Sequence, residues 1–348
     1  MLTIIQGKGT LPREQAGRNI HYDDASLSNY KKVEQGDFII HLRSFEGGLE
    51  MANEAGIVSP AYTILRCKRP HSSLFYDAYF HTDEFINHNL SKSVEGIRDG
   101  RQISYEAFKW LGIPYCEPTE QEKISTLFSA FNERIAKQRD LVESLKKYKR
   151  GVNNQILSQI DNSYNCRLGS VCEIVGGGTP DTLHAEYWGN TVEWFTPSEI
   201  GKTKYVNNSV RKLSDIGLDN SSAKLLPIGT VLLTTRATLG EMSIAKRECS
   251  TNQGFQSLIP HTDRVSSEYL YYMQIIIKPW CEKYASGNTF REISKSALSD
   301  CIIPIPDRAR QEQIVKLLSS IDMIIDAAES ISMSLSKIRH GLMQQLFI

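Results

Sequence analysis

The sequence lacks the features that mark several common classes of protein. None of its 348 residues lies in a run of about 18 consecutive apolar residues, so we expect no membrane span. The first residues do not show a basic segment followed by an apolar one, which argues against a signal peptide. The 7 cysteines are scattered and form no C-x-x-C pair, a pattern typical of reduced thiols. These absences predict a cytoplasmic protein that binds no metal.

Motifs of catalysis are missing as well. Gly201-Lys202-Thr203 is the nearest approach to a phosphate-binding loop, but Thr196 stands where that motif needs glycine. None of the lysines has Asp or Glu two positions before it, which argues strongly against a nuclease of the PD-(D/E)xK type. Ser59-Pro60-Ala61-Tyr62 departs from the amino-methyltransferase motif at its third place, and Gly176-Gly177-Gly178 is not followed by a helical pattern. We therefore predict no catalytic residue and no cofactor.

What the sequence does contain is an internal repeat. Gln121-Glu122-Lys123-Ile124 recurs as Gln311-Glu312-Gln313-Ile314, at an offset of 190. Further upstream the offset is 193, where Gly36–Ile40 matches Gly229–Leu233. Two copies of one module therefore follow each other, each with an irregular α/β region and then a long helix. The stretch 167–193 of the second copy has no counterpart in the first, so we expect an N-terminally incomplete first domain.

Short patterns predict the local elements of the second copy. Val231–Thr235 and Gln256–Ile259 are short apolar runs bounded by turn residues, which favours strands. Tyr269–Ile277 is predicted to form one short helix. Before the first long helix, Thr119 and Glu122 have the spacing of a capping box, which predicts that the helix starts there.

The long helices carry apolar residues every three and four positions, which is the spacing of a coiled-coil seam. Roughly forty residues at 1.5 Å each give a rod of about 60 Å. The alternative is a pair of unrelated amphipathic core helices, but two copies of equal length can satisfy each other as an antiparallel pair. Polar residues interrupt the seam at Gln138, Lys149, Ser332 and Arg339 and can fix its register. We expect packing through Ile124, Phe128, Phe131, Ile135, Val142, Leu145, Ile314, Leu318, Ile321, Ile325, Leu335 and Leu342.

Charge is balanced over the chain, with 40 basic and 40 acidic residues, so any surface that binds nucleic acid must be local. Between 200 and 295 basic residues outnumber acidic ones and stand among Asn, Gln, Thr and Tyr. Arg and Lys neutralise phosphates, and Arg, Asn and Gln form paired hydrogen bonds with base edges. The alternative for each residue is a solvent-facing loop position. The candidate DNA-binding residues are Lys202, Lys204, Arg236, Thr238, Asn252, Gln253, Thr289 and Arg291, with Arg43, Ser44 and Arg101 in the first copy.

The order of motifs in the second copy resembles a known family. Gly176–Pro180 is followed by Trp194–Ile200, then by Arg236–Gly240, and finally by Ile303–Pro306 with Gln311–Ile314. This order is similar to that of a target-recognition domain of type I restriction–modification specificity subunits, together with its conserved helix. The resemblance covers essentially the whole chain, as two copies.

The resemblance implies an α+β fold in which two α/β target-recognition domains are separated by an antiparallel two-helix coiled-coil spacer. It implies a non-catalytic subunit that binds double-stranded DNA and reads one half of a bipartite target with each domain. The helices are expected to set the gap between the half-sites and to dock methyltransferase subunits, which an endonuclease subunit joins. Methylation and cleavage then belong to the partners.

On this basis we expect a first recognition domain over 1–112, a spacer helix over 113–160, a second recognition domain over 161–302 and a second spacer helix over 303–348. Because the first domain lacks its opening, an alternative is an inactive product or a donor for recombination with an intact specificity gene. An atypical DNA methyltransferase is a further alternative, and methyl transfer by the purified chain alone would distinguish it.

Overall fold

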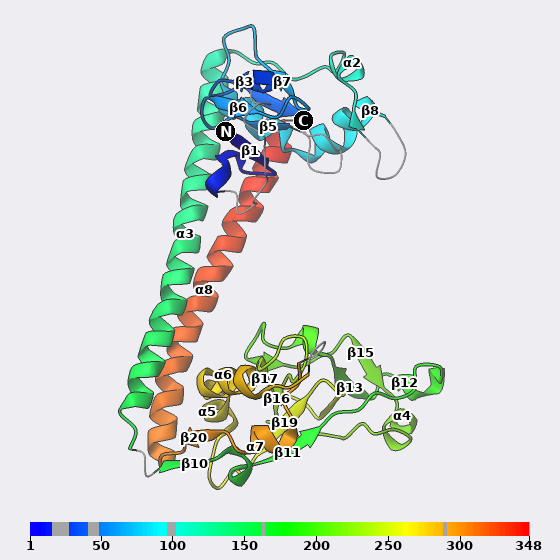
Figure 1. Ribbon diagram of the computed structural model, residues 1–348, viewed down its shortest axis with the longest axis vertical. Helices are drawn as coiled ribbons and strands as arrows, with labels where there is room; N and C mark the ends of the chain where they lie inside the picture. The colour runs from blue at the N-terminus through cyan, green and yellow to red at the C-terminus, as the bar shows by residue number, and fades with distance from the viewer. Residues whose placement is uncertain (16–27, 41–48, 96–101, 162–163, 288–290, 348) are drawn as a thin grey trace. The chain divides into compact units, whose positions relative to one another are not determined.

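The computed structural model describes residues 1–15, 28–40, 49–95, 102–161, 164–287 and 291–347 (Figure 1). It divides into two compact units, which are described separately. Unit 1 comprises Met1–Val142 and Ala328–Ile348, and unit 2 comprises Glu143–Ala327. Each unit contains one α/β part and a portion of both long helices, α3 (Pro118–Ser158) and α8 (Arg308–Leu346).

The α/β part of unit 2 is built on a five-stranded sheet with the order β11-β19-β16-β17-β14. Its strands pair antiparallel except β14, which runs parallel to β17. A four-stranded sheet has the order β12-β15-β13-β18, and β10 pairs with β20. The strands are β10 (Asn165–Arg167), β11 (Cys172–Gly176), β12 (Trp188–Gly189), β13 (Val192–Phe195), β14 (Tyr205–Val206), β15 (Arg211–Leu213), β16 (Val231–Leu233), β17 (Met242–Ala245), β18 (Cys249–Thr251), β19 (Gln256–Pro260) and β20 (Ile302–Pro304).

The central strand β16 is apolar throughout because both of its faces are buried. Val231 and Leu233 point to a core shared with the helices, and Leu232 points to a second core that contains Phe255. The helices of this part are α4 (Asp215–Asp219), α5 (Ser267–Tyr272), α6 (Gln274–Tyr284) and α7 (Lys295–Ser299). In Figure 1, α5 and α6 lie between the five-stranded sheet and the long helices.

The strands predicted at 231–235 and 256–259 are confirmed as β16 and β19. The single helix predicted at 269–277 is wrong, because the chain breaks there into α5 and α6 at Met273. Met273 is fully buried, and Ser266 caps α5 by accepting a hydrogen bond from the backbone of Tyr269. The break thus falls among other buried residues, and an apolar run alone does not reveal it.

Unit 1 repeats this plan with shorter elements. Its strand β4 pairs with β5 and β7, as β16 pairs with β17 and β19. The elements are β1 (Leu2–Ile5), β2 (Gly9–Pro12), β3 (Lys31–Val33), β4 (Phe38–Ile40), β5 (Leu49–Met51), β6 (Gly56–Val58), β7 (Thr63–Leu65), α1 (Ser73–Phe80), β8 (Val94–Glu95), β9 (Gln102–Ile103) and α2 (Tyr105–Phe108).

Matching hydrogen bonds confirm that the two copies are one structural module. In unit 1, the buried side chain of Gln121 accepts a bond from Ser72 N (2.9 Å) and donates one to Cys116 O (2.8 Å). In unit 2, Gln311 accepts from Ser266 N (3.2 Å) and donates to Pro306 O (2.9 Å). In each unit, therefore, a glutamine at the start of a long helix fixes the helix that covers the sheet, either α1 or α5. We call this arrangement the glutamine clamp.

The two long helices begin in different ways. Asp307 caps α8, since its side chain accepts a hydrogen bond from Arg310 N (2.9 Å). Helix α3 begins at Pro118, a residue suited to the first helical position because it has no N–H to satisfy. The predicted capping box at Thr119 and Glu122 is therefore wrong, because Thr119 already lies inside the first turn.

The long helices lie antiparallel in both units. In unit 2, Ile156 near the end of α3 shares a core with Ile314 and Leu318 near the start of α8. In unit 1, Phe128 near the start of α3 stacks against Phe347, just beyond the end of α8, with ring centroids 6.2 Å apart. This confirms the predicted fold class, α+β with an antiparallel pair of long helices.

A polar residue in the seam has a defined partner. Gln138 is buried, and its Nε2 donates a hydrogen bond to the backbone oxygen of Ala328 at 3.0 Å. By the repeat offset, Ala328 is the counterpart of Gln138 itself. A buried amide with a single backbone partner favours one register of the pair, because a shifted register would leave it unsatisfied.

Candidate nucleic-acid interface

The candidate site is centred on the loop that joins β16 to β17, residues 234–241. Within the described part of the chain, Ala237 is the one non-glycine residue with a positive φ, of 57°. That conformation costs an ordinary residue about 1 kcal/mol, so it persists only where its surroundings hold it. The Thr234 hydroxyl supplies part of that hold by donating to Thr238 O, and the backbone of Glu241 donates back to Thr234 Oγ1 at 3.0 Å.

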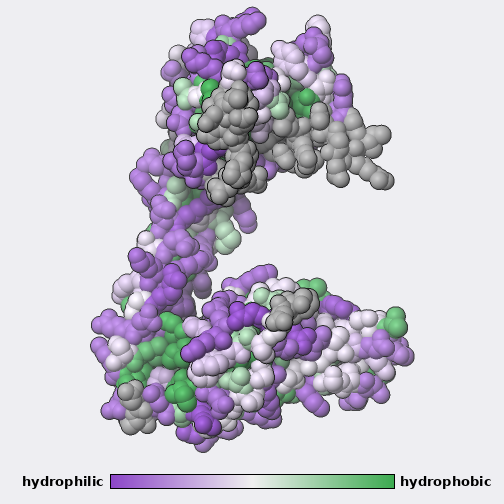
Figure 2. Space-filling model, in the orientation of Figure 1, coloured by the Kyte–Doolittle hydropathy of each residue, from purple (hydrophilic) through white to green (hydrophobic). Residues whose placement is uncertain are grey.

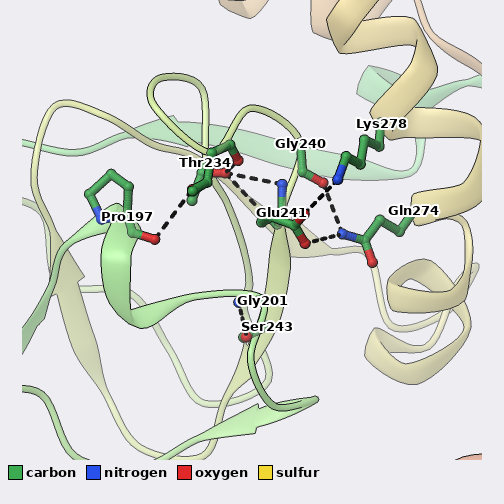
Figure 3. Close-up of polar contacts among 9 residues, drawn as sticks. Pro197, Gly201, Thr234, Gly240, Glu241, Ser243, Gln274 and Lys278 are labelled. Atoms are coloured by element: carbon green, nitrogen blue, oxygen red, sulfur yellow. Dashed lines mark hydrogen bonds and ion pairs between the residues drawn. The ribbon is translucent and has the colours of Figure 1, made fainter. Parts of the chain in front are cut away.

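Neighbouring elements fix this loop from two sides (Figure 3). Thr238 Oγ1 donates to Pro197 O at 3.3 Å, which ties the tip of the loop to the turn at Pro197–Glu199. From α6, Gln274 Nε2 donates to Gly240 O at 3.0 Å and to Glu241 Oε2 at 3.1 Å. The loop therefore presents its exposed side chains from a constrained backbone, as base recognition requires.

Two arginines from the predicted set lie at this loop. Arg236 Nη2 contacts Glu292 Oε2 at 2.8 Å, and both side chains are partly exposed. Arg291 is exposed, and its guanidinium donates to the backbone oxygen of Glu282. Arg291 and Thr238 line one groove, together with Ala237, Leu239, Glu241, Lys278 and Glu282. The structure thus brings together Arg236, Thr238 and Arg291.

Asn252 and Gln253 belong to an adjoining loop. Asn252 Oδ1 accepts a hydrogen bond from Gly254 N at 2.9 Å, and Gln253 Oε1 accepts one from the Thr179 hydroxyl. The backbone of Thr235 donates to Gly254 O at 2.7 Å, which joins this loop to the end of β16. The glycine run of 176–178 allows close approach here, since a Cβ on Gly177 would lie 2.0 Å from Asn252 O.

Lys204 does not join this group. Its Nζ donates to Tyr272 OH and to Ser319 Oγ, both at 3.0 Å, and lies 4.4 Å from the centre of the Tyr272 ring. Burial lowers the pKa of Lys204, although the charge of Asp322 acts in the opposite direction. We therefore assign Lys204 to the packing of this part of unit 2 against α8, and leave it out of the interface proposed below.

The remaining candidates have different positions. Lys202 is exposed on a turn whose Gly201 donates its N–H to Ser243 Oγ at 3.2 Å, beside the loop (Figure 3). Thr289 in the second copy, and Arg43, Ser44 and Arg101 in the first, lie outside the described residues. Their assignment to DNA binding stays a prediction.

The predicted helix-packing residues are all buried or half-buried. Those at the start of α3 and the end of α8 belong to the core of unit 1, and those at the start of α8 belong to the core of unit 2. The buried members are Phe128, Ile135, Val142, Ile314, Leu318, Ile321 and Ile325, and the half-buried ones are Ile124, Phe131, Leu145, Leu335 and Leu342.

Sequence reasoning missed the residues that shape the site. Gln274 and Glu241 hold the loop, but neither belongs to a motif, and they lie 33 residues apart. Arg211 was also missed. Its guanidinium stacks 3.5 Å from the centre of the Trp188 ring and lies 5.7 Å from that of Trp194. Trp194 entered the sequence analysis only as part of the family resemblance, and nothing in the spacing signals that an arginine lies over the two tryptophans.

Within the residues that the structure describes, no three side chains of His, Cys, Asp or Glu are grouped so that they could hold a metal ion. None of the described helices combines the length and the hydrophobicity that a membrane crossing requires.

Comparison with known proteins assigns the family. Residues 160–335 match the family described as the type I restriction modification DNA specificity domain. Because this match spans half of the chain and includes the whole site described above, the chain belongs to that family.

Individual relatives carry the corresponding names. The chain is 34% identical over 186 residues to the type I restriction enzyme MjaIX specificity subunit of Methanocaldococcus jannaschii. The matched region covers 52% of this chain and 43% of that protein. It is 24% identical over 259 residues to the EcoR124I/EcoR124II specificity subunit of Escherichia coli, and the matched region covers 70% of this chain and 63% of that protein. The chain thus spans less than two thirds of the length of these relatives.

A solved structure shares the fold. It comes from work on the complex assembly and conformational transition of the type I R-M system, and it superposes with a TM-score of 0.62 at 21% identity. The superposition covers 91% of this chain and 83% of the other.

Proposed function

We propose that this protein is a sequence-reading specificity subunit of a type I restriction–modification complex. It binds double-stranded DNA and reads a bipartite target, one half with each copy of the module. The observation that carries the proposal is the constrained loop between β16 and β17, which lies inside the family match and presents Arg236 and Thr238. The duplicated glutamine clamp supports two readers in one chain.

The proposed DNA surface of the second copy consists of three neighbouring segments. Arg236 and Arg291 supply donors that fit guanine or phosphate, and the amides of Asn252 and Gln253 fit adenine. Thr238 lies at the tip of the loop, and Lys202 provides a positive charge nearby. By the repeat, Arg43, Ser44 and Arg101 are proposed for the first copy. We retain 1–112 and 161–302 as the recognition domains, and 113–160 and 303–348 as the spacer segments.

An exposed apolar stripe along the long helices is the proposed docking surface for methyltransferase subunits. On α8, apolar residues recur every seventh position and are exposed: Leu317 (47%), Ile324 (55%), Ile331 (48%) and Ile338 (52%). The first copy has Leu127, Leu141 and Tyr148 exposed at matching places of α3. Figure 2 shows a hydrophobic patch over the unit 2 part of the helix pair. This second apolar stripe lies beside the seam that joins the two helices, because each of its residues comes one position before a seam position in the heptad, and it fits helices of a partner.

Catalysis is proposed to reside in the partners. The sequence has none of the motifs that bind S-adenosylmethionine, nucleotides or a nuclease metal, and its candidate residues suit recognition. We propose that methyltransferase subunits modify the DNA and that an endonuclease subunit cleaves it. No observation favours an inactive product, a recombination donor or a stand-alone methyltransferase.

The test is reconstitution. The chain is co-expressed with a methyltransferase subunit of a type I restriction–modification system, and the purified complex is tested for binding to duplexes that differ in sequence. We expect co-purification and binding that depends on sequence. Failure to co-purify, or equal binding to every duplex, would contradict the proposal.

A further inference from the structure

The ion pair between Arg236 and Glu292 lies at the edge of the candidate interface and serves no evident structural purpose. Its side chains are 43% and 34% exposed, and the contact between Nη2 and Oε2 measures 2.8 Å. Ion pairs exposed to this degree add little to stability, because water screens them and two long side chains must be ordered. A carboxylate on a surface that meets phosphates also weakens binding. The pair therefore calls for a functional explanation.

Both ends of the pair are anchored through the backbone. Arg236 lies in the constrained loop, where the next residue adopts the positive φ of 57°. Glu292 is held by two backbone hydrogen bonds with Ser286, one from Glu292 N to Ser286 O (2.9 Å) and one from Ser286 N to Glu292 O (3.0 Å). With both backbones fixed, the carboxylate restricts the directions in which the guanidinium can point. A guanidinium has five N–H donors, so one contact leaves donors for a second partner.

We propose that Glu292 is a specificity-determining positioning residue of the DNA interface. It holds the Arg236 guanidinium in one orientation, so that its donors meet a matching base edge. Its negative charge opposes the alternative in which Arg236 turns to the nearest phosphate of any sequence. This inference rests on the proposed function, since it assumes that the surface meets DNA.

The repeat does not preserve the acidic partner of this pair in sequence. By sequence, the position of Glu292 is occupied in the first copy by Gln102, which is neutral, while Arg236 is matched by Arg43. By sequence, the two copies carry the same arginine, but the second has an acidic residue where the first has Gln102. We therefore expect the second copy to discriminate more strongly between DNA sequences than the first copy does.

The test compares two isosteric substitutions in the full chain, assembled with its methyltransferase partner. Glu292→Gln removes the charge that faces Arg236. Glu282→Gln removes an equal charge from the groove beside the pair, and the hydrogen bond described between Arg291 and Glu282 uses the backbone oxygen of Glu282. Dissociation constants are measured for the target duplex and for a scrambled duplex.

For Glu292→Gln we expect tighter binding to the scrambled duplex, and a loss of discrimination on the order of tenfold, the scale of one paired base contact. Glu282→Gln should tighten both complexes alike and leave the ratio of the two constants unchanged. Glu292→Asp, which keeps the charge, should recover part of the discrimination. In an Arg236→Ala background, Glu292→Gln should cause no further loss.

The proposal would be overturned if Glu292→Gln and Glu282→Gln gave the same ratio of the two dissociation constants. It would also be overturned if Glu292→Gln reduced discrimination as strongly in the Arg236→Ala background as in the unsubstituted protein. If the complex without substitutions bound the target duplex and the scrambled duplex equally, the result would instead contradict the proposed function. A thermal melt of each variant separates these outcomes from misfolding, and Glu292→Asp provides the second variant if Glu292→Gln does not fold.

Discussion

At the scale of single residues, the buried polar side chains are the most informative. The two clamp glutamines, Gln121 and Gln311, are nearly inaccessible to solvent and use both ends of the amide. Gln311 also donates to Arg264 O at 2.8 Å. Because buried amides are stable only when satisfied, these residues fix where each α/β part joins its long helix.

Replacing Gln311 with Ala should therefore destabilise the protein. The change leaves the backbone groups of Ser266, Arg264 and Pro306 without this partner, at a cost of about 1–3 kcal/mol. Urea unfolding measures the loss. Gln313→Ala is the control, because Gln313 is exposed and bonds only the Arg310 side chain among the described contacts. Equal effects of the two changes would contradict the role of the clamp.

A histidine in unit 1 gives a prediction of pH dependence. His81 Nε2 lies 3.3 Å from the buried Glu50, Asp77 acts on both through its charge, and Arg339 faces Asp77. Burial acts to lower the pKa of His81, but the Glu50 hydrogen bond and the charge of Asp77 outweigh it and raise the pKa to about 9. The protonated form is thus favoured on folding. The stability it contributes is complete below about pH 6.5, the pKa of an unfolded histidine, and is lost as pH rises through 9.

The free energy of unfolding should accordingly fall between pH 6.5 and pH 9, by an amount on the order of 2 kcal/mol. His81→Gln introduces the residue type that unit 2 has at the matching position, Gln274. It should remove most of the fall in the free energy of unfolding between these pH values. His261→Gln, at an exposed site, should leave it intact. Denaturant unfolding at several pH values measures both. An unchanged slope in His81→Gln would refute the assignment.

At the scale of elements, periodicity in the sequence predicted the long helices and the repeat because both depend on local spacing. It failed at two element boundaries. A predicted helix is interrupted at Met273, and Pro118 rather than Thr119 begins α3. Where a helix ends is decided by tertiary packing and by capping contacts, and a pattern of apolar residues does not contain that information.

Adjacent leucines on α8 separate folding from partner binding. Leu318 is fully buried, so Leu318→Ala should cost about 2–5 kcal/mol of stability. Leu317 is 47% exposed, so Leu317→Ala should change stability by no more than about 0.5 kcal/mol. If the exposed stripe docks the methyltransferase, Leu317→Ala should instead weaken that complex. Unfolding curves and a binding titration measure the two effects, and an unaltered complex would argue against the docking surface.

At the scale of the whole molecule, the sequence could predict the class of site but not its composition. Arg236, Thr238 and Arg291 were predicted from their residue types. The structure places Arg236 and Thr238 in one loop, and Thr238 and Arg291 line one groove. Lys204 matched the same pattern, yet its ammonium is held by Tyr272 and Ser319. Residues such as Gln274 contribute through contacts between distant segments. Composition identifies candidates, and only the fold shows which of them face the same way.

The central claim is that one chain carries two DNA readers with different specificities. The most direct measurement is a genome-wide map of methylated adenines in cells that carry the intact gene, no gene, or the Arg236→Ala variant. We predict a bipartite methylated sequence that disappears without the gene, and whose discrimination relaxes at one half only in the variant. A map that is unchanged when the gene is removed would contradict the account.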